Sequence, residues 1–139
     1  MPIEVRDVMG RVAIAVNMGA SFADIVATMK RYAVGAVTVI DADRRPVGMV
    51  SGEDLLLKDT DAVCFEGRAA TGCTAAELMT SPAVTVTPET PLEEAAQLMR
   101  EKNVKQLPVI DPLTARVLGT LHQPDVLRAL TRSAAPSSL

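Results

Sequence analysis

Aromatic side chains are scarce in this chain: they make up 2% of its 139 residues, with no tryptophan, one tyrosine and two phenylalanines. Proteins that bind single-stranded nucleic acid usually stack bases on aromatic side chains, and this chain has almost none to offer. The net charge is −3, and lysine and arginine are scattered among acidic residues along the sequence. No basic face is indicated, so we expect no nucleic-acid partner.

Histidine and cysteine are equally scarce, with one and two residues. Cys64 and Cys73 do not form a Cys-x-x-Cys pair, and one histidine cannot complete a zinc site, so no metal is predicted. We interpret both cysteines as reduced thiols, and a redox role stays open as the alternative. The sequence also lacks a nucleophile elbow, a Walker loop and paired carboxylates in one frame, which argues against an enzyme.

Long apolar runs are missing as well. Arg6 and Asp7 interrupt the N-terminal segment, and no run reaches the length of a signal or membrane helix. We therefore expect no membrane partner and a cytoplasmic location. Hydrophobic residues still make up 48% of the chain, most of them aliphatic. A chain of this length can bury about two thirds of its unfolded surface, so an aliphatic core can form without a disulfide or a metal.

Helices and strands are indicated by caps and by apolar periodicity. Ser21 and Asp24 have the spacing of a capping box and predict the start of a helix. An apolar stripe follows at helical spacing, formed by Phe22, Ile25, Val26 and Met29. Residues 12–16 and the β-branched run 34–40 predict strands, and the polar segment 41–46 predicts a turn before the next strand.

The second half of the chain repeats this pattern. Adding 70 to the residue number carries the helix stripe onto a second one, formed by Leu92, Ala95, Ala96 and Met99. Thr90 is the expected N-cap there, with Pro91 at the first helical position. After one inserted residue, Gly48 falls on Gly119 and Asp54 on Asp125. A register held across a helix and two strands indicates an internal duplication.

We divide the chain into repeat 1 at 1–66, a linker at 67–73, repeat 2 at 74–132 and a disordered tail at 133–139. Each repeat is predicted to run helix-strand-helix-strand-strand-helix. One repeat is too small to bury a comfortable core alone. We therefore expect an α/β fold of two repeats related by a pseudo-twofold axis, each a small mixed sheet packed with helices.

The stretch from Gly48 to Asp54 carries the clearest polar pattern of repeat 1. Residues typical of a strand directly precede Ser51, and Asp54 follows three residues later. One interpretation is a capping box that satisfies the first N–H groups of a helix. The other is a binding site, because a helix N-terminus attracts phosphate and a carboxylate one turn later can accept hydrogen bonds from a ribose.

Taken together, these segments resemble a tandem cystathionine-β-synthase-type (CBS) domain pair, also called a Bateman module. The resemblance covers about 5–130 and rests on Asp7-Val8-Met9, Glu77-Leu78-Met79, the 103–111 strand and the 48–54 stretch. It implies a regulatory sensor that binds an adenosine compound, such as AMP, ADP, ATP or S-adenosylmethionine, in clefts between the repeats. It implies no required cofactor.

The resemblance also implies which residues bind. Ser51 is expected near the phosphate, Asp54 on the ribose, and Lys105 as a cation beside the phosphates. The full set for this first cleft is Met49, Ser51, Asp54, Ala83, Val84, Val104, Lys105 and Gln106.

The resemblance implies a second, weaker cleft in which the two repeats exchange their contributions. Its residues are Ala13, Ile14, Val34, Gly35, Ala36, Thr120, His122 and Asp125. This set departs from the family pattern, because His122 stands where serine or threonine is expected and Pro124 follows it. We therefore expect the first cleft to be the occupied one.

Two further partners are expected. The resemblance suggests a homodimer, and the lack of an output domain in the sequence suggests a regulated protein on a separate chain. The alternative function is a ligand-free scaffold that dimerises or docks another protein through its exposed helix faces, with no small-molecule site.

Overall fold

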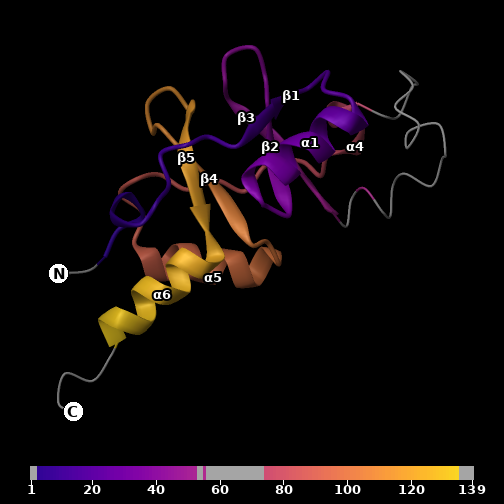
Figure 1. Cartoon of the computed structure of the whole chain (residues 1–139). Helices are drawn as coiled ribbons and strands as arrows, with labels where there is room; N and C mark the ends of the chain where they lie inside the picture. Colours follow the sequence, from indigo (N-terminus) through magenta and orange to yellow (C-terminus); the bar gives the residue numbers. More distant parts are fainter. Residues whose placement is uncertain (1–2, 53–54, 56–73, 135–139) are drawn as a thin grey trace. The chain divides into compact units, whose positions relative to one another are not determined.

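The computed structural model of the chain, shown in Figure 1, describes residues 3–52, 55 and 74–134. The chain separates into two compact units. The terminal unit combines Met1–Ala13 with Val84–Leu139, and the central unit is Ile14–Ala83. The units group the chain differently from the two sequence repeats, because each unit includes a short segment that precedes the body of the other repeat.

The central unit holds a three-stranded mixed sheet in the order β1-β2-β3. Its strands are β1 (Ala15–Asn17), β2 (Ala36–Ile40) and β3 (Pro46–Ser51). β1 runs parallel to β2, and β2 runs antiparallel to β3. The helices α1 (Phe22–Tyr32) and α4 (Ala75–Leu78) also belong to this unit. The strand predicted at 12–16 thus begins three residues later than expected, at Ala15.

The terminal unit repeats this plan with a smaller sheet. Its elements are the 3-10 turn η1 (Val5–Asp7), α5 (Leu92–Lys102), β4 (Gln106–Ile110), β5 (Val117–His122) and α6 (Gln123–Ala134). β4 and β5 are antiparallel, and the counterpart of β1 is reduced to one parallel bridge between Val86 and Val109. The mixed α/β class with a small sheet in each repeat is confirmed.

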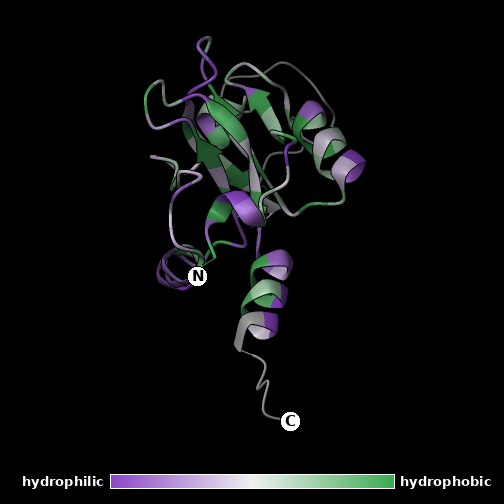
Figure 2. Ribbon diagram, turned by 90° about the vertical axis from the view of Figure 1, so that its left-hand side faces the viewer, coloured by the Kyte–Doolittle hydropathy of each residue, from purple (hydrophilic) through white to green (hydrophobic). Residues whose placement is uncertain are grey.

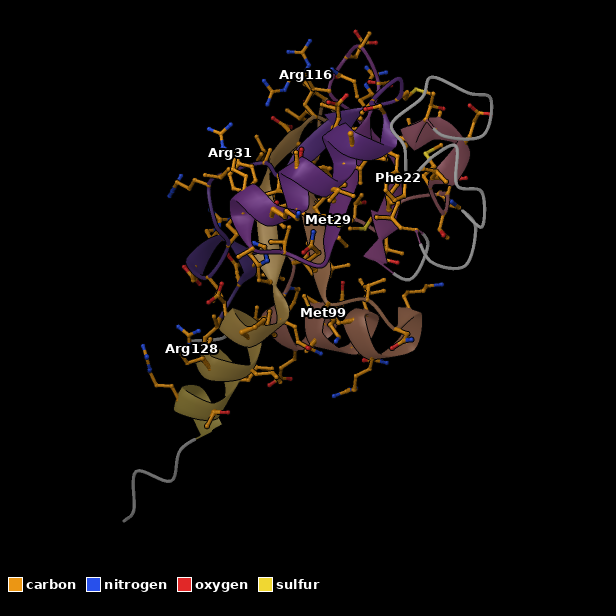
Figure 3. The ribbon with its side chains drawn as sticks, turned by 45° about the vertical axis from the view of Figure 1, so that its right-hand side comes forward. Phe22, Met29, Arg31, Met99, Arg116 and Arg128 are labelled. Atoms are coloured by element: carbon orange, nitrogen blue, oxygen red, sulfur yellow. The ribbon has the colours of Figure 1, made fainter. Side chains whose placement is uncertain are left out.

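The buried side chains form two aliphatic clusters, one in each unit. The predicted helix stripes supply both: Ile25 is fully buried in the central cluster, and Leu92, Ala95 and Met99 are buried in the terminal one. Figure 3 shows Phe22 and Met29 on α1 and Met99 on α5. In Figure 2 the strands are mainly green, whereas α6, next to the C-terminus, carries both green and purple residues.

Helices α1 and α5 begin differently. The Ser21 hydroxyl accepts from the Asp24 N–H, and the Asp24 carboxylate accepts from the Ser21 N–H, both at 3.1 Å, so the predicted capping box is confirmed. The predicted cap of α5 is wrong. Pro91 is the N-cap residue and has no polar side-chain atom with which to cap the helix. The Thr90 hydroxyl accepts instead from the N–H of Thr87 at 3.1 Å.

Each unit is closed by a segment from the other repeat. In the terminal unit, the Gly10 N–H donates to the Thr120 carbonyl at 2.9 Å, and the Thr120 N–H donates back at 3.0 Å. In the central unit, Thr80 exchanges the same pair of bonds with Met49, at 2.8 and 3.0 Å. Gly10 and Thr80 occupy equivalent positions in the two repeats. The duplication is therefore visible in the backbone pairing itself.

Glycine is required where these segments cross. A Cβ at Gly48 would lie 2.5 Å from the Met79 sulfur and 2.9 Å from the Thr80 carbonyl oxygen. A Cβ at Gly119 would collide with the carbonyl oxygen of Gly10 and lie 2.7 Å from the Met9 methyl carbon. These contacts explain why a glycine stands at the same place in both repeats: a side chain there would push the incoming segment away.

Gly119→Ala is expected to lower the free energy of unfolding by about 1 to 3 kcal/mol, because the added methyl group meets backbone rather than a movable side chain. Urea denaturation followed by circular dichroism measures the loss. Gly19→Ala is the matched control, since nothing lies within 4 Å of a Cβ at that position. Equal unfolding midpoints for both variants would contradict the close approach.

Helices α1 and α5 end alike. Ala33 and Asn103 adopt left-handed backbone conformations, with φ of 54° and 53°, and the residue after each donates to the carbonyl four residues before the cap at 3.0 Å. Asparagine tolerates this conformation better than alanine does. Repeat 2 thus has a better-suited residue at this end than repeat 1.

Ala33→Gly is expected to raise the free energy of unfolding by about 0.5 to 1 kcal/mol, because glycine adopts positive φ without strain. Ala27→Gly, an exposed position within α1, is the control. It should lower stability by a similar amount, because glycine is a poor residue in a helix interior. Thermal or urea unfolding of the two variants distinguishes the signs, and a loss of stability in both would refute the strain at Ala33.

Candidate functional site

The sheet of the central unit has one face turned to the aliphatic cluster and one turned away from it. Val37 pairs with Val50 and Val39 with Gly48, and these valines belong to the cluster. Because side chains alternate along a strand, the residues between them lie on the opposite face. In β2 and β3 that face carries Ala36, Thr38, Met49 and Ser51. Two of the predicted first-cleft residues, Met49 and Ser51, therefore share one surface.

The end of β3 lies beside the beginning of β2. Ser51 is in register with Ala36, and the Gly52 N–H donates to the Gly35 carbonyl at 2.9 Å. Gly52, directly after Ser51, is helical. The structure thus brings together residues that the sequence assigned to different clefts: Ser51 to the first, and Gly35 and Ala36 to the second.

The terminal unit repeats this arrangement. Gln106 is in register with His122, and the Gln123 N–H donates to the Lys105 carbonyl at 2.8 Å. Lys105 is exposed, whereas Gln106 is buried. Lys105 and Gln106, predicted for the first cleft, therefore lie beside His122, predicted for the second. In each unit, the start of one strand (β2 or β4) lies beside the end of the next (β3 or β5), and both carry candidate residues.

Thr120 is engaged with the protein backbone. Its side chain is buried, and its hydroxyl donates to the Val12 carbonyl at 3.2 Å. Val12 is next to Ala13, so two predicted residues of the second cleft are brought together in the terminal unit. This hydroxyl fastens the N-terminal segment to β5. The equivalent residue in the central unit is Met49, which has no hydroxyl.

Of the two equivalent aspartates, Asp54 and Asp125, the described residues include Asp125. Asp125 lies in the first turn of α6 and forms an ion pair with Arg128, at 3.2 Å, on the surface of the helix. Arg128 is labelled in Figure 3. Both side chains are well exposed, so the pair contributes little to stability. Asp54, its counterpart in repeat 1, lies outside the described residues, as do Cys64 and Cys73.

The remaining predicted residues lie before strands or at the boundary of the units. Val34 precedes β2, Val104 precedes β4, and Ile14 is buried in the central cluster. Ala83 is the last residue of the central unit, and Val84 is the first residue of the second segment of the terminal unit.

One polar residue on the central face escaped the sequence analysis. Thr38 stands in the middle of an otherwise apolar strand, and its counterpart in repeat 2 is Pro108. Comparing the two repeats position by position would have shown it. A buried threonine in place of a proline is a signal that apolar periodicity alone does not give.

Other kinds of site are not supported by the described residues. None of the helices among 3–52, 55 and 74–134 combines the length and apolarity needed to cross a membrane. Over the same residues, no group of three or more histidine, cysteine, aspartate or glutamate side chains could hold a metal ion. A shallow depression in the central unit is lined by Val16, Asn17, Gly19, Ala20 and Asp24 and contains none of the predicted site residues.

Comparison with known proteins gives consistent results. The CBS domain family model matches the chain twice, at residues 5–60 and 75–132. The CBS domain-containing protein YhcV of Bacillus subtilis is 30% identical over 108 residues, covering 77% of this chain and 72% of that protein. The crystal structure of CBSX2 in complex with AMP is 30% identical, with a TM-score of 0.77, and covers 94% of this chain and 97% of that one.

Some relatives are longer. The uncharacterized protein MK0525 of Methanopyrus kandleri is 25% identical over 126 residues, which is 91% of this chain but 62% of that protein. The two matches to the family model cover most of the chain, and they fall on the two halves that the internal duplication defines. The chain therefore belongs to the CBS domain family and is a tandem CBS domain pair.

Proposed function

We propose that the chain is a regulatory module that binds an adenosine-containing ligand in the first of the two predicted clefts. The proposal is supported by the family and by CBSX2, a 30% identical relative whose structure contains AMP. The observation that carries it is the end of β3, where Ser51 on the outward face is followed directly by helical Gly52. A hydroxyl and a helix start at one point favour a phosphate group.

Each predicted residue has a role in this proposal. Ser51 donates a hydrogen bond to a phosphate oxygen, and Lys105 adds a positive charge nearby. Asp54 accepts hydrogen bonds from the ribose hydroxyls. With so few aromatic residues, the purine lies between aliphatic side chains, for which Met49, Val84 and Val104 are the candidates.

The second cleft is proposed to bind more weakly or not at all. Thr120 donates its hydroxyl to the Val12 carbonyl, and His122 replaces the hydroxyl residue found at Ser51. A ligand there finds fewer hydrogen-bond donors than in the first cleft. Gly35 and Ala36 also offer no polar side chains from the facing strand.

The module is proposed to be a cytoplasmic, non-enzymatic homodimer that passes ligand binding to a separate protein. A ligand that binds one conformation of a module better than another shifts the population toward that conformation. The partner protein then recognises the conformation that has become more populated. No catalytic residue and no required cofactor belong to this proposal.

A thermal-shift panel of AMP, ADP, ATP, S-adenosylmethionine and NAD tests the function. One class of adenosine compound should raise the melting temperature, because a ligand at about 100 times its Kd adds about 2.7 kcal/mol to stability. Asp54→Ala should weaken binding of that compound at least about tenfold, or about 1.4 kcal/mol, by removing the ribose contact. Isothermal titration calorimetry measures the change.

Asp125→Ala is the matched control, since it removes the equivalent carboxylate of repeat 2 and should leave the affinity of the first cleft unchanged. If no compound raises the melting temperature, the ligand proposal fails and the scaffold alternative takes its place. Retention of a partner protein by a double Asp54→Ala, Asp125→Ala variant would then support docking without a ligand.

A further inference from the structure

Met79 places its sulfur atom in the space that a side chain at position 48 would fill. A Cβ on Gly48 would lie 2.5 Å from the Met79 sulfur and 2.9 Å from its Cγ atom. Gly48 is buried in β3, whereas Met79 is partly exposed. The thioether therefore packs against a buried strand residue, while Met79 remains partly accessible to small dissolved molecules.

The surroundings of this sulfur suit an apolar group and not a polar one. Met79 packs against the aliphatic cluster of the central unit. The Thr80 carbonyl oxygen lies 2.9 Å from the same Cβ position on Gly48, and a carbonyl oxygen only accepts hydrogen bonds. A sulfoxide oxygen added to Met79 would lose hydrogen bonds to water and would meet another acceptor there. Oxidation should therefore move the side chain away from β3.

The segment 75–80 that carries Met79 is fastened to the central unit on both sides of this residue. Before it, Leu78 is 1% exposed and belongs to the central cluster. After it, Thr80 exchanges two backbone hydrogen bonds with Met49 of β3. A displacement of the Met79 side chain therefore acts directly on the pairing between this segment and β3.

Other methionines lie in different surroundings. Met18 is 40% exposed, and Met99 is 3% exposed within the terminal cluster. Met9 holds the place equivalent to Met79, but its atom nearest to a Cβ on Gly119 is the methyl carbon, at 2.7 Å. Of these four methionines, Met79 is the one that combines partial exposure with a sulfur atom packed against a strand.

We propose that Met79 is a reversible oxidation site, and that its conversion to the sulfoxide loosens the segment 75–80 from β3. The oxidant is a small peroxide such as hydrogen peroxide. The sulfur takes one oxygen atom as the O–O bond breaks, so the thioether loses two electrons, the peroxide gains them, and water leaves. Methionine sulfoxide reductases reverse the change. This inference does not depend on ligand binding.

Treatment of the folded chain with hydrogen peroxide tests the proposal. Peptide mass spectrometry follows oxidation at each methionine, and thermal unfolding follows stability. Once Met79 is converted, the melting temperature should fall by about 3 to 8 °C, because a polar group then lies against β3. Amide hydrogen exchange at Met49 and Thr80 should become faster. The two methionine sulfoxide reductases, one for each sulfoxide epimer, should restore both properties.

Three substitutions separate oxidation from loss of the methionine itself. Met79→Gln places a polar side chain of similar length at this position and should lower the melting temperature without peroxide. Met79→Leu has no sulfur, so peroxide should no longer lower its melting temperature by the amount seen in the wild type. Met18→Gln is the matched control at an exposed methionine and should leave the melting temperature unchanged.

A measurement on the wild type covers the case in which the Met79 variants do not fold. After partial oxidation and mild heating, sulfoxide at Met79 should be enriched in the protein that unfolds and precipitates first, whereas sulfoxide at Met18 should be evenly divided. Even division at both positions would overturn the proposal. So would a Met79 that stays reduced while Met18 is fully converted, an unchanged melting temperature after conversion of Met79, or an equal peroxide-induced fall in Met79→Leu.

Discussion

The structure depends on the close passage of a short backbone segment against the last strand of each unit. Gly10 and Thr120 exchange two backbone hydrogen bonds, and Thr80 and Met49 exchange the equivalent pair. The crossing is possible because the residue before the bridge on the strand is glycine in both units, Gly48 and Gly119. Side chains carried by the crossing segments complete the interiors: Val5 is buried in the terminal cluster and Leu78 in the central one. Neither compact unit is therefore formed by one repeat alone.

The same crossing fixes the strand that carries the candidate residues. With β3 held between β2 and the bridge at Thr80, its side chains from Gly48 to Ser51 alternate between the aliphatic cluster and the opposite face. Ser51 is thereby kept on the outward face at the point where helical residues begin. The register of β2 against β3 places Thr38 on that face as well. A slip of one residue would bury Ser51 in the cluster and expose valines.

The two repeats keep one backbone plan and differ in their polar atoms. At the bridge, Thr120 uses its hydroxyl to hold the Val12 carbonyl, where Met49 has only an apolar side chain. In the middle strand, Thr38 has a buried hydroxyl without a partner, where Pro108 has none. The Thr120 hydroxyl therefore forms a hydrogen bond within the fold, whereas the Thr38 hydroxyl forms none.

The sequence by itself determined the duplication, the two helix stripes, the capping box at Ser21 and the mixed α/β class. The helix stripes, the capping box and the fold class follow from local periodicity or spacing, and the duplication follows from comparing the two halves of the sequence. It misplaced the start of α5, because the Thr90 hydroxyl bonds within a turn to Thr87. Only the tertiary structure decided which segments close each unit, why Gly48 and Gly119 are required, and which face Thr38 shares. Those features depend on pairing between residues distant in the chain, and such pairing leaves no local periodicity in the sequence.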